Sequence, residues 1–270
     1  MPIKNTSPEL PKVSLIVSTY NWPEALNLCL QSIRNQVFLP DEVIVADDGS
    51  GEETRQLIES IISEFPTPLK HVWHEDAGFR KTIILNNAIK VASGEYIVQV
   101  DGDVILNKYF IKDHLFSAEW GTFVRGTRAM LSPKKTQQIF HSGNINLSPW
   151  DAGVINRNNA MRFSIFQSMG SRKEMSSRSV RGSNLAFWKS DFIHVNGYNN
   201  DLTGWGHEDE ELAARLINNG ITKKIVKLCA VQYHLHHAHL SRQNENWQNS
   251  IVQKTVAEKI MRCTNGYDAS

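Results

Sequence analysis

The stretch EYIVQVDGDVIL, residues 95–106, decides the fold and raises the first question about function. An apolar, strand-like run ends at Val100 and is followed at once by Asp101, Gly102 and Asp103. Two carboxylates this close repel each other, so the pair needs a nearby cation or a place in a polar turn. Asp and Gly are common turn residues, and a hard divalent cation such as Mg²⁺ or Mn²⁺ prefers oxygen ligands. On these residues alone, both interpretations stay open.

This stretch closes a regular alternation of strand-like and helix-like segments. The expected strands are 13–20, 41–50, 69–75 and 95–101, and the expected helices are 21–36, 54–65 and 79–93. Pro23 suits a first helical turn, and Ile84, Ala88 and Val91 recur at helical spacing. Such an alternation is typical of a parallel sheet with covering helices. The sequence therefore predicts an α/β fold with a central, mostly parallel sheet flanked by helices.

Polar clusters follow three of these strands. The clusters are Ser18-Thr19-Tyr20-Asn21, Asp47-Asp48-Gly49-Ser50 and Asp101-Gly102-Asp103. In parallel sheets ligands bind beyond the carboxyl ends of the strands, so we expect the clusters to converge on one binding site. Arg80 and Lys81, at a helix start after Gly78, could meet a diphosphate there, helped by free backbone N–H groups. Both are equally typical of a solvated surface.

The second half of the chain is less regular. Residues 133–180 read as a long loop region with short elements, which is common for lids and substrate-shaping segments. KKIVKLCAVQYH, residues 223–234, predicts one late strand, and a helix-like stretch follows near 250–262. No linker separates two independent units, so we expect a single domain over residues 1–270.

Composition excludes several classes of protein. The 29 basic and 28 acidic side chains leave a formal net charge of +1, which gives no reason to expect a nucleic-acid partner. Cys29, Cys229 and Cys263 form no CxxC pair, which excludes a zinc ribbon or a disulfide scaffold. No apolar run reaches the roughly 18 residues of a membrane span. We expect a cytoplasmic protein, with peripheral contact at the inner face of the membrane left open.

The segment TGWGHEDEELAARL, residues 203–216, places an aromatic residue and several acids side by side. Acids in a first helical turn are favoured by the helix dipole, which is a purely structural explanation. That explanation does not account for Trp205, held between Gly204 and Gly206. A carboxylate beside an aromatic floor could serve as a general base for a hydroxyl, with Trp205 packing on a sugar ring.

A histidine cluster, YHLHHAH at residues 233–239, follows the late strand. Histidine is most often structural or surface-exposed, but such a cluster favours a metal site. Zinc alone is a competing interpretation, because short His-rich tracts can bind it. No GxGxxG, GxxxxGK[ST] or GxSxG motif is present, which weakens dinucleotide-binding, P-loop and α/β-hydrolase interpretations.

In combination these motifs resemble the family 2 glycosyltransferases with the GT-A fold. The resemblance covers VSLIVSTYNWPEAL, PDEVIVADDGS and EDAGFRKTIILNNAIKVASGEYIVQVDGD, and it resumes at VRGSNLAFWKSDFIHVNGYNNDLTGWGHEDEELAARLINNGI. This last segment is similar to bacterial chondroitin-polymerase domains and animal β-1,4-galactosyltransferases. The resemblance implies a nucleotide-sugar-binding half at 12–105, an acceptor-binding and catalytic half at 106–245 and a C-terminal tail at 246–270.

The resemblance also implies roles for individual residues. Donor-binding residues would be Thr19, Tyr20, Asn21, Asp47, Asp48, Arg80, Asn86, Asp101, Gly102 and Asp103. Mn²⁺ or Mg²⁺ would be held by Asp103, His234 and Asp101, with His237 as the alternative histidine. Asp209 would be the catalytic base and Glu208 its neighbour on the acceptor, whose sugar sites Asn184 and Trp205 would shape.

The activity implied is inverting, metal-dependent transfer of a sugar from a UDP-sugar to a hydroxyl of a glycan or lipid-linked glycan. The expected context is assembly of bacterial surface polysaccharide or lipooligosaccharide. One alternative is a sugar-phosphate nucleotidyltransferase, which would want a Gly-rich basic loop where this chain has STYNWPEAL. The other is a carbohydrate- or nucleotide-binding protein with a decayed site. Retention of Asp101, Asp103, Asp209 and His234 together disfavours the latter.

Overall fold

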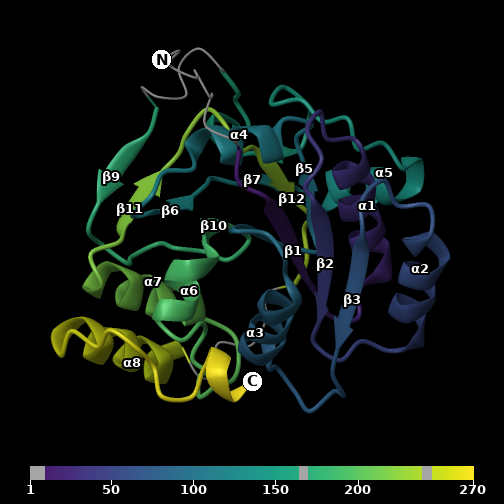
Figure 1. Ribbon diagram of the computed structural model, residues 1–270. Coiled ribbons are helices and arrows are strands. Elements are labelled where there is room, and N and C mark those ends of the chain that lie inside the picture. The colour runs from purple at the N-terminus through teal and green to yellow at the C-terminus, as the bar shows by residue number, and fades with distance from the viewer. Residues whose placement is uncertain (1–9, 164–169, 239–244) are drawn as a thin grey trace, which may run out of the picture.

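The computed structural model describes residues 10–163, 170–238 and 245–270 (Figure 1). The strands are β1 (Val13–Thr19), β2 (Glu42–Asp47), β3 (Leu69–Trp73), β4 (Tyr96–Asp101), β5 (Val104–Leu106), β6 (Thr122–Arg125), β7 (Ala129–Leu131), β8 (Val154–Ile155), β9 (Arg172–Glu174), β10 (Asn184–Trp188), β11 (Thr222–Ile225) and β12 (Gln232–His234). The helices are α1 (Pro23–Arg34), α2 (Glu52–Ile62), α3 (Lys81–Val91), α4 (Phe110–Ser117), α5 (Pro133–Ser142), α6 (Lys189–His194), α7 (Glu208–Asn218) and α8 (Glu245–Ala257), with 3₁₀ turns η1 (Arg157–Asn159) and η3 (Tyr267–Ala269).

The larger sheet confirms the predicted α/β class. Its strand order is β3-β2-β1-β4-β10-β6-β11-β9, and β1 to β4 run parallel, as the alternation of the first hundred residues predicts. β10 is antiparallel to β4 and β6, while β11 runs parallel to β6. The second half of the chain therefore extends the sheet of the first half.

Helices cover both faces of this sheet, which explains why its central strands are apolar throughout (Figure 1). On one face, Val13, Leu15 and Val17 of β1 pack in a cluster with residues of α1, α2 and α4. On the other face, Ile16 packs in a cluster with residues of α3, α6 and α7. All seven residues of β1 are buried, so its carboxyl end is fixed firmly in the core.

The prediction of a single strand over 223–234 is wrong, because the chain turns between β11 and β12. Leu228 and Ala230 have positive φ angles of 60° and 47°, which no strand residue adopts. β11 stays in the larger sheet, whereas β12 joins a smaller one with the order β5-β12-β7-β8. β12 pairs antiparallel with β5, so His234 lies opposite Val104, one residue beyond Asp103. The break thus carries the histidine cluster to the end of β4.

The irregular segment 133–180 has more structure than expected. It contains α5, whose N-cap Ser132 side chain accepts a hydrogen bond from the Lys135 backbone N–H, and the short strands β8 and β9. Residues 164–169 of this segment lie outside the described residues, as does His239 of the histidine cluster.

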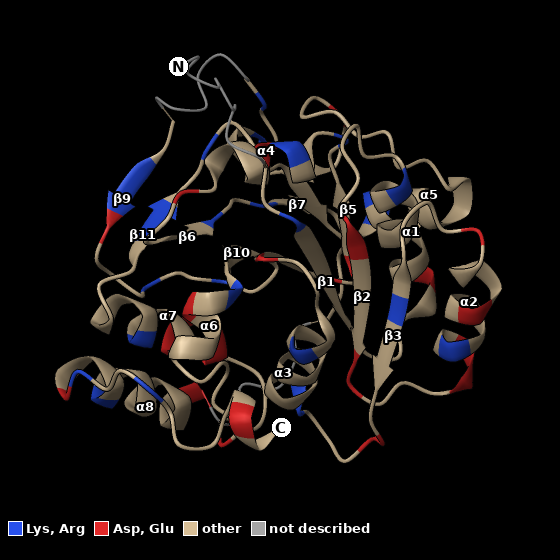
Figure 2. Cartoon of the chain, viewed as in Figure 1, with Lys and Arg blue, Asp and Glu red and all other residues tan. Residues whose placement is uncertain are grey.

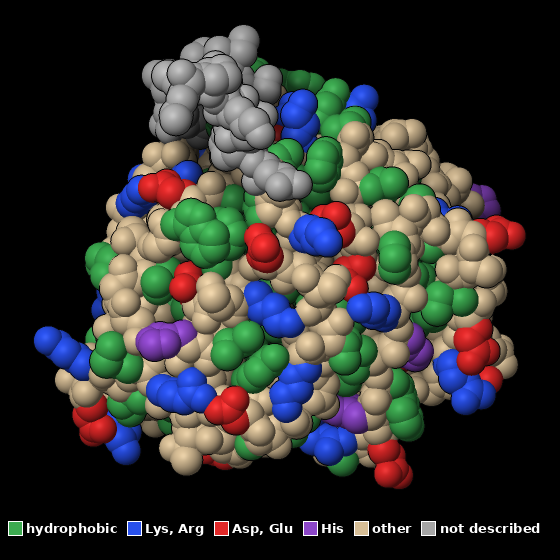
Figure 3. All heavy atoms as spheres, viewed as in Figure 1, with side chains coloured by type: hydrophobic (Ala, Val, Ile, Leu, Met, Phe, Trp, Pro, Cys, Tyr) green, Lys and Arg blue, Asp and Glu red, His purple; other side chains and the backbone are tan. Residues whose placement is uncertain are grey.

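Charged residues are distributed over all layers of the fold (Figure 2). On the face shown in Figure 3, basic, acidic and hydrophobic side chains are interspersed and form no continuous basic surface. This distribution agrees with the formal net charge of +1. Among the described residues, no helix is both long enough and apolar enough to cross a membrane.

A buried ion pair anchors α7, the helix that begins with the acidic segment. Arg215 is fully buried, and its Nη2 lies 2.6 Å from Oε2 of Glu211 one turn earlier. Arg215 also donates through Nη1 to the Val195 carbonyl at 2.6 Å, and Thr255 of α8 donates to Glu211. The pair therefore connects α7 to α8 and to the end of α6.

We expect Arg215→Met to lower the free energy of unfolding by about 3–5 kcal/mol, because it leaves the Glu211 carboxylate buried without its cation. The matched control is Arg55→Met, since Arg55 pairs with Glu52 on the surface and its side chain is 58% exposed. The control should cost at most about 1 kcal/mol. Urea unfolding followed by circular dichroism measures both, and equal losses would contradict the structural role of the buried pair.

Candidate functional site

The carboxyl ends of β1, β2 and β4 bring the three polar clusters together, as predicted. Thr19 pairs with Asp47 across β1 and β2, and Ser18 pairs with Asp101 across β1 and β4. The Ser18 hydroxyl donates to Oδ1 of Asp101 at 2.9 Å. A Cβ on Gly102 would lie 3.1 Å from the Ser18 carbonyl oxygen, so glycine permits the close approach of the two strand ends.

Two histidines that the sequence analysis did not single out hold the aspartates that follow β2. Nε2 of His71 lies 2.9 Å from Oδ2 of Asp47, and Nε2 of His74 lies 2.8 Å from Oδ1 of Asp48. Burial raises the pKa of Asp48, which His74 partly opposes. The other Asp48 oxygen accepts the backbone N–H of Arg80 at 3.0 Å. The two histidines of LKHVWHE, at the end of the third strand, are the sequence feature from which these contacts could be predicted.

Tyr20 and Asn21, which follow β1, lie beside these aspartates. Tyr20 is half exposed, and its hydroxyl donates to Oδ2 of Asp76 at 2.9 Å. Asn21 has a φ of 45° and its side chain accepts the backbone N–H of Gly51 at 2.8 Å. The exposed ring of Tyr20 is therefore held in a fixed position where a planar group can stack on it.

Asp101 is neutralised by a lysine that the sequence analysis assigned to a diphosphate or to the surface. Nζ of Lys81, at the first residue of α3, lies 2.6 Å from Oδ1 of Asp101. Although burial opposes it, the charge of Lys81 lowers the pKa of Asp101 to about 2. Burial also disfavours the charge on Lys81, yet the carboxylates of Asp101, Asp209 and Glu208 together raise its pKa.

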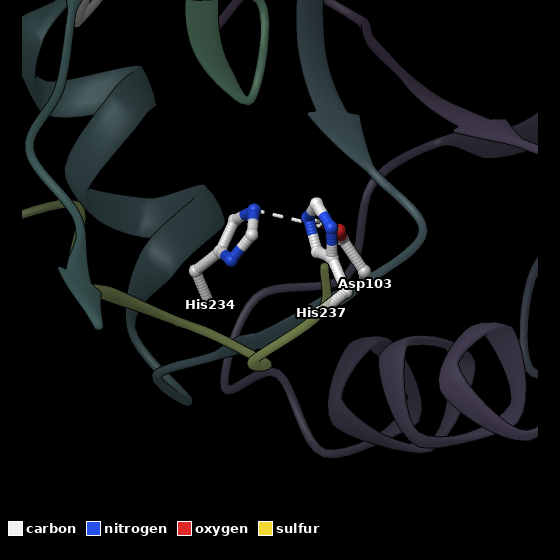
Figure 4. A group of neighbouring side chains, drawn as sticks. All are labelled: Asp103, His234 and His237. Atoms are coloured by element: carbon white, nitrogen blue, oxygen red, sulfur yellow. Dashed lines mark ion pairs between the residues drawn. The ribbon is translucent and has the colours of Figure 1, made fainter. Parts of the chain in front are cut away.

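Asp103 faces a different partner set, the imidazoles of His234 and His237 (Figure 4). Its Oδ2 lies 3.4 Å from Nε2 of His234 and 3.2 Å from Nε2 of His237. Nδ1 of each histidine lies 2.7 Å from a backbone carbonyl oxygen, that of Leu235 or Ala238. A carbonyl only accepts, so each Nδ1 carries the proton and each Nε2 of a neutral ring turns a lone pair toward the carboxylate.

This arrangement fits a divalent cation. Two lone pairs and a carboxylate repel one another unless a cation joins them, and oxygen with imidazole nitrogen suits Mn²⁺ or Zn²⁺. Oδ1 of Asp103 is buried and has no hydrogen-bond partner among the described residues. Burial lowers the pKa of His234, which favours the neutral ligand form. A hydrogen bond from protonated His237 to Asp103 raises the pKa of His237, so a proton competes with a cation for this histidine. Asp101, predicted as a third ligand, is occupied by Lys81 and Ser18 and lies outside this cluster.

Asp209 and Glu208 open α7 and lie within electrostatic range of Lys81 and Asp101. The Tyr198 hydroxyl lies 2.9 Å from Oδ1 of Asp209, and the Gly182 backbone N–H donates to Oδ2 at 2.6 Å. Both oxygens of this carboxylate are thus held by the protein. Burial raises the pKa of Asp209, and Lys81 lowers it. Burial and the charge of Asp209 raise the pKa of Glu208 to about 7.

The structure corrects the predictions for two asparagines. Asn86 is fully buried in α3, where its side chain bonds to the backbone of Tyr198 and to Asn200. Asn184 is buried too, and its amide donates to the carbonyls of Thr127 and Ala230. Neither side chain has a polar atom left for a ligand, so both support the backbone around the site.

Two other predicted residues are Trp205 and Arg80. Trp205 is 38% exposed between its two glycines, and its role in stacking on a sugar stays a prediction. The Arg80 side chain bonds to the Glu75 carbonyl, and its backbone positions Asp48. Tyr198, Gly182, His71 and His74 are the supporting residues that motif comparison alone did not find.

The family of the chain follows from comparison with known proteins. Residues 14–178 match the family described as Glycosyl transferase family 2, and residues 165–240 match a family described as N-terminal domain of galactosyltransferase. The first match spans more than half of the chain. The chain therefore belongs to glycosyl transferase family 2.

Curated relatives are between 26% and 34% identical to this chain over the aligned residues. A validoxylamine A glucosyltransferase of Streptomyces hygroscopicus subsp. limoneus is 29% identical over 233 residues, which is 82% of this chain and 51% of the relative. Chondroitin synthase of Escherichia coli is 29% identical over 240 residues, covering 82% of this chain and 34% of the relative. The chain thus spans about half the length of the first of these proteins, and less of the second.

Solved structures confirm the GT-A fold. A mannosyltransferase from Pyrobaculum calidifontis in complex with GDP-Man and Mn²⁺ superposes with a TM-score of 0.60 at 20% identity, over 89% of this chain and 60% of that one. Residues 1–349 of Staphylococcus aureus TarS in complex with UDP give a TM-score of 0.60 at 19% identity, over 93% of this chain and 69% of that one.

The environment of Glu208 predicts a pH-dependent stability. Folding raises its pKa from 4.5 to about 7, so the folded state binds this proton more tightly than the unfolded chain does. The resulting stabilisation is complete below about pH 4.5 and is lost as the pH rises through about 7. Glu208→Gln should therefore raise the free energy of unfolding at pH 8 by roughly 3 kcal/mol and change little at pH 4.5.

Thermal unfolding at the two pH values measures this difference. Glu59→Gln is the matched control, because Glu59 lies on α2 with its side chain 66% exposed, and we expect no pH-dependent gain from it. If Glu208→Gln lowers the free energy of unfolding equally at both pH values, folding does not raise the pKa of Glu208.

Proposed function

We propose that this chain transfers a sugar from a UDP-sugar to a hydroxyl of a glycan or lipid-linked glycan, with inversion at the anomeric carbon. The observation that carries the proposal is the pairing of two sites at one sheet edge. Asp103, His234 and His237 form a cluster with the ligand types of a divalent-cation site, and Asp209 is a fixed carboxylate on α7. Lys81 lies next to both sites, because its ammonium pairs with Asp101 and its charge lowers the pKa of Asp209.

The donor is proposed to lie over the ends of β1 and β2. The exposed ring of Tyr20 offers a stacking surface for a uracil, and Asp48 lies close by, held by His74 and the Arg80 backbone. Family membership and the UDP complex of TarS support a nucleotide-sugar at this place. The GDP-Man complex of the mannosyltransferase shows that a different nucleotide occupies a similar fold.

Asp103, His234 and His237 are the residues that would hold Mn²⁺ or Mg²⁺. When bound, the cation supplies positive charge that stabilises the diphosphate leaving group. Asp101 is not proposed as a ligand of the cation, because its charge is balanced by Lys81. The Mn²⁺ in the mannosyltransferase complex supports the choice of metal.

Asp209 is proposed as the general base. Its carboxylate would take the proton of the acceptor hydroxyl while the oxygen attacks the anomeric carbon from the face opposite the departing nucleotide. The hydrogen bonds from Tyr198 and Gly182 hold the carboxylate in one orientation. Glu208, with a pKa near 7, and Trp205 would contact the acceptor sugar. Inversion gives a β-linkage from an α-linked donor.

The alternatives fit the site less well. A binding protein with a decayed site has no need for a cation cluster, a buried base and a lysine between them. A sugar-phosphate nucleotidyltransferase lacks support from the relatives, which are named as transferases of sugars. The chondroitin synthase relative favours a role in assembling a surface polysaccharide.

The test is a panel of UDP-sugars incubated with the protein and Mn²⁺, with released UDP as the readout. We expect release from one donor, abolished by EDTA. With that donor and its acceptor, Asp209→Asn should lower the transfer rate by about 10² to 10⁴-fold, as expected for loss of a general base.

Calorimetry with UDP provides the control for Asp209→Asn. Its UDP affinity should equal that of the wild type, because Asp209 is not a donor contact. Absence of UDP release across the panel, together with absence of UDP binding, would refute the proposed donor site. An Asp209→Asn variant with full transfer activity would refute the assignment of the base alone.

A further inference from the structure

Three arginines border the candidate site without a carboxylate partner. Arg125 ends β6, Arg128 immediately precedes β7, and Arg181 immediately precedes Gly182. Within the described parts of the chain, none of the three forms an ion pair with an Asp or Glu side chain within 4.0 Å. This differs from the buried Arg215, which is paired with Glu211.

Arg125 and Arg128 each donate a hydrogen bond to a neutral group. Nε of Arg125 donates to the Ser179 carbonyl at 3.0 Å, and Nη1 of Arg128 donates to the Ser183 hydroxyl at 3.4 Å. Burial lowers the pKa of both guanidinium groups, and the charge of Arg181 lowers both further. Both bonds end in the segment 179–183, which contains Arg181, so the three arginines gather at one place where like charges repel one another.

The acids that attract Arg125 and Arg128 do not fully relieve the repulsion among the three arginines. Glu174 attracts Arg125, but its carboxylate is already 2.8 Å from Nζ of Lys223 and 3.3 Å from Nη2 of Arg172. Asp101 and Asp103 attract Arg128, and both are committed to the site described above. Partly buried guanidinium groups without a counter-charge are costly, and arginine is well suited to bind phosphate or carboxylate groups.

The arginines are attached to both parts of the site. The Gly182 N–H that follows Arg181 holds Asp209, so Arg181 is next in sequence to a contact of the base. β7, which follows Arg128, pairs with β12, the strand that carries His234.

We propose that Arg125, Arg128 and Arg181 bind a phosphate or carboxylate group carried by the acceptor, close to the hydroxyl that Asp209 deprotonates. The inference rests on the proposed function, since it takes Asp209 as the base and places the donor over β1 and β2. It narrows the acceptor to an anionic glycan or a phosphate-bearing one.

The test measures binding of methyl phosphate and of glucuronate to the full chain by calorimetry, in the presence of Mn²⁺ and saturating UDP. We compare the wild type with Arg181→Gln and Arg128→Gln. Arg181 is exposed, so its replacement leaves the core intact, and circular dichroism verifies the fold of Arg128→Gln. Arg55→Gln on α2 is the control for loss of one positive charge.

We expect wild type and Arg55→Gln to bind at least one of the two probes with UDP in place, and both site variants to bind it at least tenfold more weakly. Probe binding that is equal in Arg181→Gln and wild type, or that is absent with UDP present, would overturn the proposal. Displacement of the probe by UDP would also overturn it, because the arginines would then serve the donor diphosphate.

UDP affinity, measured in the same samples, separates this inference from the proposed function. If the protein binds a probe through Arg181 but does not bind UDP in the presence of Mn²⁺, the donor assignment fails while the anion site is upheld. If it binds UDP and neither probe, the donor assignment is upheld and the anion site fails.

Discussion

The site depends on one electrostatic constraint, the gathering of four carboxylates at a single edge of the sheet. Asp101 and Asp103 come from the end of β4, and Glu208 and Asp209 from the start of α7. Lys81 supplies the cation for this group, with its ammonium 2.6 Å from Asp101 and the charges of Asp209 and Glu208 acting on it. The adjacent acids of DGD therefore coexist because each faces a different partner, Lys81 for Asp101 and the histidine pair for Asp103.

The arrangement of the two sheets allows Asp101 and Asp103 to face different partners. The larger sheet fixes the ends of β1, β2 and β4 by burying both of their faces. The first strand of the smaller sheet, β5, begins at Val104, immediately after Asp103, and pairs with β12. Backbone pairing between those strands, rather than any long-range side-chain contact, places His234 beside Asp103. A lysine on a helix and two histidines on a separate sheet thus reach two carboxylates that are one residue apart.

Much of this arrangement could be predicted from the sequence, because the first hundred residues carry a regular pattern. Apolar runs that alternate with amphipathic helices specify a parallel sheet, and a parallel sheet brings its strand ends together. The break between β11 and β12 could not be predicted, since Leu228 and Ala230 adopt positive φ angles without the glycine that usually marks them. Asn86 and Asn184 were misassigned because a motif match does not reveal whether an amide faces the core or a ligand. The partner of Lys81 was missed for a similar reason, because its spacing from Asp101 is set by the packing of α3.

The proposed transfer depends most on the divalent cation that Asp103, His234 and His237 are proposed to hold. Calorimetric titration of Mn²⁺ into the full chain with UDP present tests this assignment most directly, with His237→Gln compared with His236→Gln. His236 is the exposed neighbour outside the cluster, so it controls for the loss of one imidazole. We expect one bound Mn²⁺ in the wild type and in His236→Gln, and an affinity weaker by at least about tenfold in His237→Gln. Equal Mn²⁺ affinity in the two variants, or no Mn²⁺ binding by the wild type, would contradict this assignment.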